Sequence, residues 1–184
     1  MRSLYERLLG PSFASLPPEV SALRRVPVHC DAVGRCDVRR GRHRGARALA
    51  ALLRLPKDGT DLPASATYTT DGPREIWHRQ FGDVAMRAIH EEGQGRLRGL
   101  LVETVGVLSF GFRVTAGPQG LRRRLVAVRL FGIELPKPHA LSISGQESVR
   151  DGRFRFDVAM DLPCFGPLIR YSGWLEPAVR ESPI

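Results

Sequence analysis

Charged and aromatic side chains interrupt the apolar, strand-like segments of this sequence at a few places, and these residues are the candidates for chemistry. They are Trp77, Arg79, Glu103, Asp157, Arg170, Tyr171 and Trp174. A charge is costly to bury unless it is paired. Arg79 paired with Glu103 would mark a site that orients the polar head of a ligand, and so would Arg170 paired with Asp157. The alternative is that all four side chains point outward and form cross-strand ion pairs, each worth on the order of a few tenths of a kcal/mol.

The three aromatic residues of this set also have two interpretations. Trp77, Tyr171 and Trp174 either fill a core or the mouth of a barrel, or offer flat surfaces on which a ligand stacks. The sequence leaves both open.

Motifs for cofactors, metals and nucleophilic catalysis are not found. Gly93, Gly95 and Gly99 miss the spacing of a dinucleotide-binding loop and lie between two predicted strands. The histidines lie in separate segments without ligand spacing, so only a metal site assembled from distant strands stays open; they are His29, His43, His78, His90 and His139. There is no GxSxG nucleophile elbow. The sequence therefore predicts no cofactor and no metal, and it identifies no catalytic residue.

The stretch from Arg153 to Leu175 positions four of the seven candidates. Apolar residues at 154, 156, 158, 160 and 162 alternate with polar or small ones, which is the period of an antiparallel strand. Pro163 ends this strand, residues 164–167 form a Gly/Pro turn, and residues 168–175 return as a second strand. Burial of five large side chains contributes on the order of 10 kcal/mol, so this face must lie against an apolar interior.

Turn signals recur at regular intervals along the rest of the chain. They separate strand-like segments at 28–38, 64–70, 75–81, 84–91, 97–104, 107–115, 121–131 and 141–150. We therefore expect a mainly β fold of about nine or ten strands, a strongly curved antiparallel meander that forms a barrel or half-barrel. A two-layer sandwich is the alternative.

Three short helices are predicted beside the strands. Residues 3–9 and 16–24 form a helical lid, and residues 47–55 form a helix that packs on the sheet or plugs it. We expect one domain over 1–184, with the lid in 1–25, the barrel in 26–176 with its inserted helix near 46–55, and a tail from 177. The inward face of 28–38 is small, which leaves room for that helix or for a ligand.

Charge and cysteine content restrict the class of protein. The formal net charge is +9, but the arginines are scattered and no nucleic-acid-binding motif is present, so we do not expect a nucleic-acid partner. No segment has the roughly 20 apolar residues of a transmembrane helix. Cys30 and Cys36 would lie about 20 Å apart on one strand, too far for a disulfide, and with Cys164 they are expected to be reduced thiols of a cytoplasmic protein.

Residues spread along almost the whole chain resemble the bacterial family known as domain of unknown function 4166. The residues that carry the likeness are Leu4-Tyr5, Leu9-Gly10-Pro11, Phe13, Leu16-Pro17, Gly34, Val38, Gly41, Trp77, Arg79, Phe81-Gly82, Glu103, Gly106, Gly132, Leu135-Pro136, Phe156-Asp157-Val158, Leu162-Pro163, Gly166, Arg170-Tyr171 and Gly173-Trp174-Leu175. The family also occurs C-terminal to Rossmann domains similar to those of saccharopine dehydrogenases and epimerases. The resemblance implies no activity and no catalytic residue, and it suggests a separate Rossmann-type oxidoreductase as a partner.

Three functions are compatible with these observations. The first is binding of an apolar or amphipathic small molecule, such as a lipid, isoprenoid or polyketide, inside the barrel. The second is a cofactor-independent cyclase or isomerase that holds such a substrate near its reactive shape. The third is an accessory domain for the Rossmann-type oxidoreductase.

Overall fold

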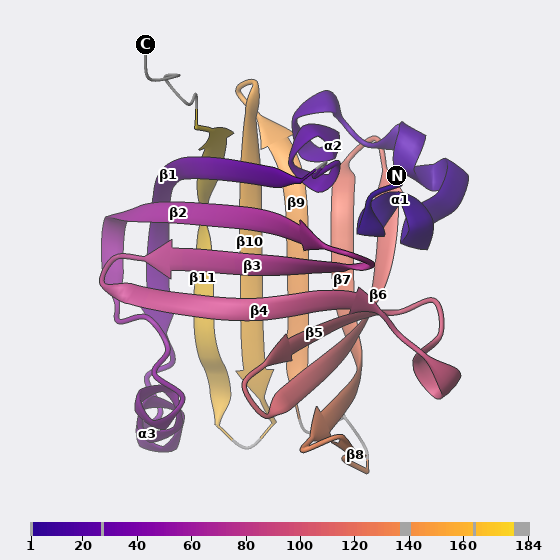
Figure 1. The fold of residues 1–184 in the computed structure, drawn as a ribbon. Coiled ribbons are helices and arrows are strands. Elements are labelled where there is room, and N and C mark those ends of the chain that lie inside the picture. Colours follow the sequence, from indigo (N-terminus) through magenta and orange to yellow (C-terminus); the bar gives the residue numbers. More distant parts are fainter. Residues whose placement is uncertain (1, 27, 137–140, 164, 179–184) are drawn as a thin grey trace.

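Ten antiparallel strands of the described chain close into a barrel, which confirms the predicted fold class (Figure 1). The structure is a computed structural model that describes residues 2–26, 28–136, 141–163 and 165–178. The strands are β1 (His29–Arg40), β2 (Gly59–Asp71), β3 (Arg74–Phe81), β4 (Val84–Glu92), β5 (Leu101–Val105), β6 (Leu108–Gly117), β7 (Gly120–Leu130), β9 (Ser142–Arg150), β10 (Arg153–Leu162) and β11 (Gly166–Pro177). Neighbours in this order are paired, β7 pairs with β9, and β11 returns to β1.

The alternation seen in the sequence determines which side chains enter the barrel. Phe154 and Val158 of β10 are buried, as are Ile169, Tyr171 and Leu175 of β11. The register places Phe154 opposite Leu175 and Val158 opposite Tyr171, so the two inward faces coincide. The predicted inward face of this stretch is therefore correct.

Two glycines allow β1 and β11 to approach closely where β1 turns from one wall of the barrel to the other (Figure 1). A Cβ atom on Gly34 would lie 1.9 Å from the carbonyl oxygen of Trp174, and one on Gly173 would lie 2.1 Å from that of Arg35. The register of β1 against β2 also shifts between Cys36 and Val38. The bend thus depends on residues without side chains.

The N-terminal helices cover one end of the barrel (Figure 1). They are α1 (Leu4–Leu9), the 3₁₀ turn η1 (Gly10–Ser15) and α2 (Pro18–Arg24). Ser3 caps α1 in a reciprocal capping box with Glu6, and Pro18 occupies the first turn of α2. α1 packs beside β4 and β6, while α2 packs beside β9 and β10. Both helices are too short to be stable without these contacts.

Helix α3 (Arg44–Leu52) starts and ends three residues earlier than predicted. It lies outside the barrel, at the end opposite α1 and α2, and packs beside β11 and β1 (Figure 1). It therefore packs on the barrel and does not plug it. The small inward residues of β1 are instead covered from inside the barrel, where the rings of Phe81, Phe156 and Tyr171 lie close together.

Two further details differ from the sequence analysis. The strand predicted over 97–104 begins only at Leu101, because η2 (Gly95–Leu97) forms a turn with Leu97 buried. A two-residue strand, β8 (Ile133–Glu134), pairs with the end of β7 and was not predicted. Cys164 and residues 179–184 of the expected tail lie outside the described residues. Cys30 and Cys36 carry free thiols.

Candidate functional site

A row of buried charged side chains crosses the barrel interior beneath α1 and α2. It runs from Arg24 at the end of α2 through Glu147 of β9, Arg123 of β7 and Glu103 of β5 to Arg79 of β3, and none of the five is more than 8% exposed. Arg24 Nε donates to Glu147 Oε2 at 2.7 Å, and Arg79 Nη2 donates to Glu103 Oε1. Arg123 lies between the two carboxylates, 3.6 Å from Glu103 and 3.8 Å from Glu147. Five elements distant in sequence therefore converge on one charged cluster.

Aromatic rings surround the guanidinium group of Arg24. Its central carbon lies 4.5 Å from the ring centre of Trp77, 5.4 Å from those of Tyr5 and Tyr68, and 5.5 Å from that of Phe154. Each such contact attracts the cation to the face of the ring. Arg24 thus links the lid to the barrel through its buried ion pair with Glu147 and through the surrounding aromatic rings.

The cluster shifts the pKa values of its acidic members in different directions. Burial alone would raise the pKa of Glu103, but the charge of Arg79 outweighs it and holds this pKa well below its usual value. In Glu147 burial is likewise outweighed, by Arg24 and Arg123, so its pKa is lowered. The pKa of Glu75 is raised, because burial outweighs the hydrogen bonds it accepts from Trp77 and the backbone of Leu4. Glu103 and Glu147 are therefore both ionised at neutral pH.

His90 lies at the edge of the cluster as an uncharged base. Its ring stacks on Trp77 with the ring centres 3.9 Å apart, and its Nε2 atom lies 3.5 Å from Glu103. Burial lowers the pKa of His90 to about 4, despite the nearby carboxylate of Glu103. At neutral pH the imidazole adds no positive charge to the interior.

Several buried polar atoms of the cluster lack a hydrogen-bond partner within the described chain. They are Arg79 Nε, Arg123 Nη1, both ring nitrogens of His90 and the hydroxyl of Tyr5. Of these residues, Arg79 and Arg123 line a cavity of about 30 Å³, together with Arg24, Glu147 and the rings of Trp77 and Tyr171, among others. A cavity of this size holds roughly two water molecules. Unpaired donors around a small cavity are a site where a hydrogen-bond acceptor binds.

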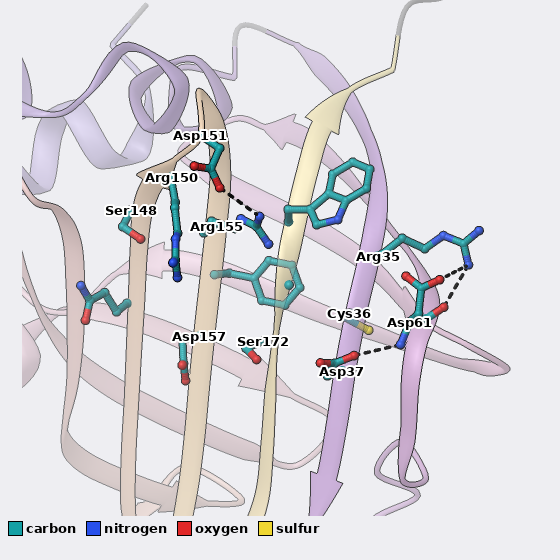
Figure 2. A pocket seen from close by; sticks show the side chains of 14 residues that line it. Arg35, Cys36, Asp37, Asp61, Ser148, Arg150, Asp151, Arg155, Asp157 and Ser172 are labelled. Carbon is teal, nitrogen blue, oxygen red and sulfur yellow. Dashed lines mark hydrogen bonds and ion pairs between the residues drawn. The ribbon is translucent and has the colours of Figure 1, made fainter.

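A second hollow lies on the outer wall of β1, β9, β10 and β11 (Figure 2). It measures about 740 Å³, within the range of ligand sites. Its acidic side chains are engaged by neighbours: Asp37 accepts from the backbone of Asp61, Asp151 lies 3.9 Å from Arg155, and Asp157 binds Arg170. This groove is therefore large but open, and its acidic side chains already have partners.

The match to known families follows the barrel itself. The family model described as Domain of unknown function (DUF4166) matches residues 16–175. The chain belongs to the DUF4166 family. The match covers α2, the first nine barrel strands and β11 as far as Leu175, and it confirms the resemblance seen in the sequence. No curated protein sequence matches this DUF4166 chain.

The DUF4166 barrel divides the seven sequence-predicted residues between its two sides. Trp77, Arg79, Glu103 and Tyr171 lie inside, where the predicted pair of Arg79 with Glu103 is formed. The other three lie outside: Asp157 and Trp174 line the outer groove, and Arg170 binds Asp157 at 2.5 Å with both side chains partly exposed. The Arg170–Asp157 pair is thus a cross-strand ion pair between β10 and β11.

Sequence reasoning missed Arg24, Arg123 and Glu147, which complete the interior cluster. Two of them carried a detectable signal. Arg123 lies on the same strand face as Leu121 and Leu125, and Glu147 lies on the same face as Ile143 and Val149. Both faces are otherwise apolar. Arg24 gave no such signal at the end of its helix. Among the described residues no group of three or more metal-ligating side chains occurs, and no helix is long and apolar enough to cross a membrane.

Proposed function

We propose that this barrel binds a small molecule that has an apolar body and a carboxylate or similar anionic head. The observation that carries the proposal is the set of buried guanidinium donors beside the cavity that have no hydrogen-bond partner among the described residues. Arg24, Arg79 and Arg123 all line the cavity, and each is at most 8% exposed. One anionic head would accept charge-assisted hydrogen bonds from Arg79 Nε and Arg123 Nη1.

The body of such a ligand would contact the aromatic rings that line the cavity. The aromatic residues that line the cavity are Tyr68, Trp77, Phe81, Phe154, Phe156 and Tyr171. The cavity of about 30 Å³ takes the head alone, since sites for drug-sized ligands measure about 300–1,000 Å³. The body therefore enters only when the lid of α1 and α2 moves away, and this opening must break the Arg24–Glu147 ion pair.

A thermal-shift comparison of matched ligands tests the proposal. Fatty acids and isoprenoid or polyketide carboxylic acids should raise the melting temperature in a concentration-dependent way, and their methyl esters should not. The Arg123→Met variant should lose the shift, measured against its own melting temperature, while Arg170→Met on the outer wall should keep it. Equal shifts from acids and esters, or no shift from any acid at millimolar concentration, would reject the proposed head site.

A cofactor-independent cyclase or isomerase is a second proposal for the same interior. It is favoured by the uncharged imidazole of His90, which lies 3.5 Å from the Glu103 carboxylate and next to the unpaired guanidinium nitrogens. Such groups can move a proton or steer charge in an apolar substrate. Product analysis of any stabilising ligand tests it, with His90→Gln and Glu103→Gln expected to stop turnover and Arg170→Met expected to retain it.

The Rossmann-type oxidoreductase partner stays a prediction from the family resemblance, and co-purification of the two proteins tests it. We also propose that the protein acts in the cytoplasm, an environment that would keep the free thiols of Cys30 and Cys36 reduced. Cell fractionation tests this location.

A further inference from the structure

Most of the exposed large apolar side chains gather at the end of the barrel opposite the lid. We call the following set the apolar end: Leu52, Leu53, Val107, Leu130, Phe131, Ile133, Leu135 and Phe165. These are eight of the eleven large hydrophobic residues that are exposed in the described chain. Leu52 is 79% exposed, Phe131 73% and Ile133 72%. Exposure of this kind on one end of a molecule indicates a contact surface.

Short connections and α3 bring these side chains together at that end. Figure 1 shows α3 and β8 projecting from the barrel in the same direction. The backbone N–H of Phe131 donates to the carbonyl of Val107 at 2.9 Å, which joins the β7–β8 turn to the β5–β6 turn. The rings of His43 and Phe165 stack 4.8 Å apart and join the start of α3 to the β10–β11 turn. The apolar end thus consists of several separate protrusions.

Positive charge lies on one side of this end, around α3. The segment 39–57, which includes α3, contains seven basic residues and no acidic one: Arg39, Arg40, Arg42, Arg44, Arg47, Arg54 and Lys57. All of them except Arg40 are exposed. Two nearby acids are already engaged, since Asp58 accepts from the backbone of Arg40 and Glu134 lies 3.6 Å from Arg129. The exposed hydrophobic side chains of the apolar end therefore lie beside a basic surface.

Phe131 occupies a backbone conformation that does not suit it. Its φ angle is 50°, and it is followed by Gly132 at 79°, in the two-residue turn that joins β7 to β8. Asparagine or glycine adopts this left-handed conformation readily, whereas a bulky aromatic residue is strained there. The aromatic ring is mostly exposed, so the fold gains little from it. A strained turn that exposes an aromatic ring favours a contact of this ring outside the barrel.

We propose that the apolar end docks on an anionic phospholipid surface. Leu52, Phe131 and Ile133 insert at the boundary between headgroups and acyl chains, while the arginines of segment 39–57 bind the lipid phosphates. A bilayer suits this surface because it receives separate protrusions at once, and because its negative charge complements the basic segment. The inference does not rest on the proposed ligand, since the interior cluster and the lid lie toward the other end of the barrel.

Co-sedimentation of the full chain with vesicles tests the proposal. We expect binding to vesicles of phosphatidylcholine with phosphatidylserine, much less to phosphatidylcholine alone, and weaker binding in high salt. Arg44→Ala with Arg47→Ala should weaken binding by about fivefold for each residue, about 25-fold together. The matched control is Arg122→Ala with Arg124→Ala, which removes the same charge from exposed positions on β7.

Phe131→Asn separates docking from folding. It relieves the strained turn, so the melting temperature should stay unchanged or rise, yet vesicle binding should weaken by about tenfold. Val33→Ser, which removes an exposed apolar side chain from the outer wall, should bind vesicles as the unchanged protein does. Binding that is absent, or equal for Phe131→Asn and Val33→Ser, overturns the proposal. Self-association that depends on Phe131 and occurs without vesicle binding also overturns it, because the partner would then be a second copy of this chain.

Discussion

Replacing Arg24 with methionine should remove more stability than any other single arginine substitution in the barrel wall or lid. Arg24 and Glu147 are each 2% exposed and lie 2.7 Å apart. Methionine keeps much of the apolar volume but leaves Glu147 buried with only Arg123, 3.8 Å away. Breaking a buried ion pair from one side costs about 3–5 kcal/mol. For a chain of this length that loss lowers the melting temperature by roughly 6–20 °C.

Urea denaturation of four proteins measures this effect. They are the unchanged chain, Arg24→Met, Glu147→Gln and the double variant, and the double variant should lose about 1–3 kcal/mol less than the sum of the single ones. Arg170→Met is the matched control, because that arginine also binds a carboxylate, Asp157, but the pair is 63% and 39% exposed. Its loss should stay below about 1 kcal/mol. If Arg24→Met and Arg170→Met cost the same, Arg24 does not hold the lid as we infer.

Two further predictions concern pH and the barrel bend. His90 is held uncharged, with a pKa of about 4 in the folded chain against about 6.5 when unfolded, so the unfolded chain binds more protons between these values. The free energy of unfolding should therefore fall as the pH drops from about 6.5 to about 4, by at most about 1.4 kcal/mol per pH unit from this residue. His90→Gln should make the curve of unfolding free energy against pH flatter in that window. An unchanged slope would contradict the lowered pKa of His90. Gly34→Ala should lower the free energy of unfolding by at least about 3 kcal/mol, because its Cβ atom would overlap the Trp174 carbonyl. In the control variant Gly117→Ala the new Cβ atom meets no atom within 4 Å, so this substitution should be tolerated. Comparable melting temperatures for the two variants would refute the close approach of β1 and β11.

The barrel could be predicted from the sequence because each strand buries one face and exposes the other. That alternation is local, and the turns that join the strands are marked by glycine and proline, as at Gly117 to Gly120. The position of α3 could not be predicted, because a helix with small buried residues at Ala46 and Ala50 fits an outer surface as well as an interior. The start of β5 was missed because the apolar Leu97 and Leu100 extend the strand pattern, although Leu97 is buried in a turn.

The candidate site was only partly predictable, for a different reason. Arg79 and Glu103 stood out because each lies among apolar strand residues, and the two strands that carry them are separated in the barrel by β4 alone. The Arg24–Glu147 pair joins residues 123 positions apart, and nothing in the local sequence specifies such a contact. Strand phase could have placed Arg123 and Glu147 inside, but only closure of the barrel shows that they meet. The strand face on which a charged residue lies is thus a better indicator of a buried site than the residues next to it in the sequence.

The Arg24 contact has a consequence for how the barrel opens. The helices of the lid are six and seven residues long, so most of their order comes from packing and from this one ion pair. A ligand that binds the open barrel must break the Arg24–Glu147 contact, and its apparent affinity is reduced by the free energy of that opening. An anionic head recovers part of this free energy, because it accepts hydrogen bonds from Arg79 Nε and Arg123 Nη1. An uncharged head recovers none, so the same ion pair that holds the lid closed would also select for anionic ligands.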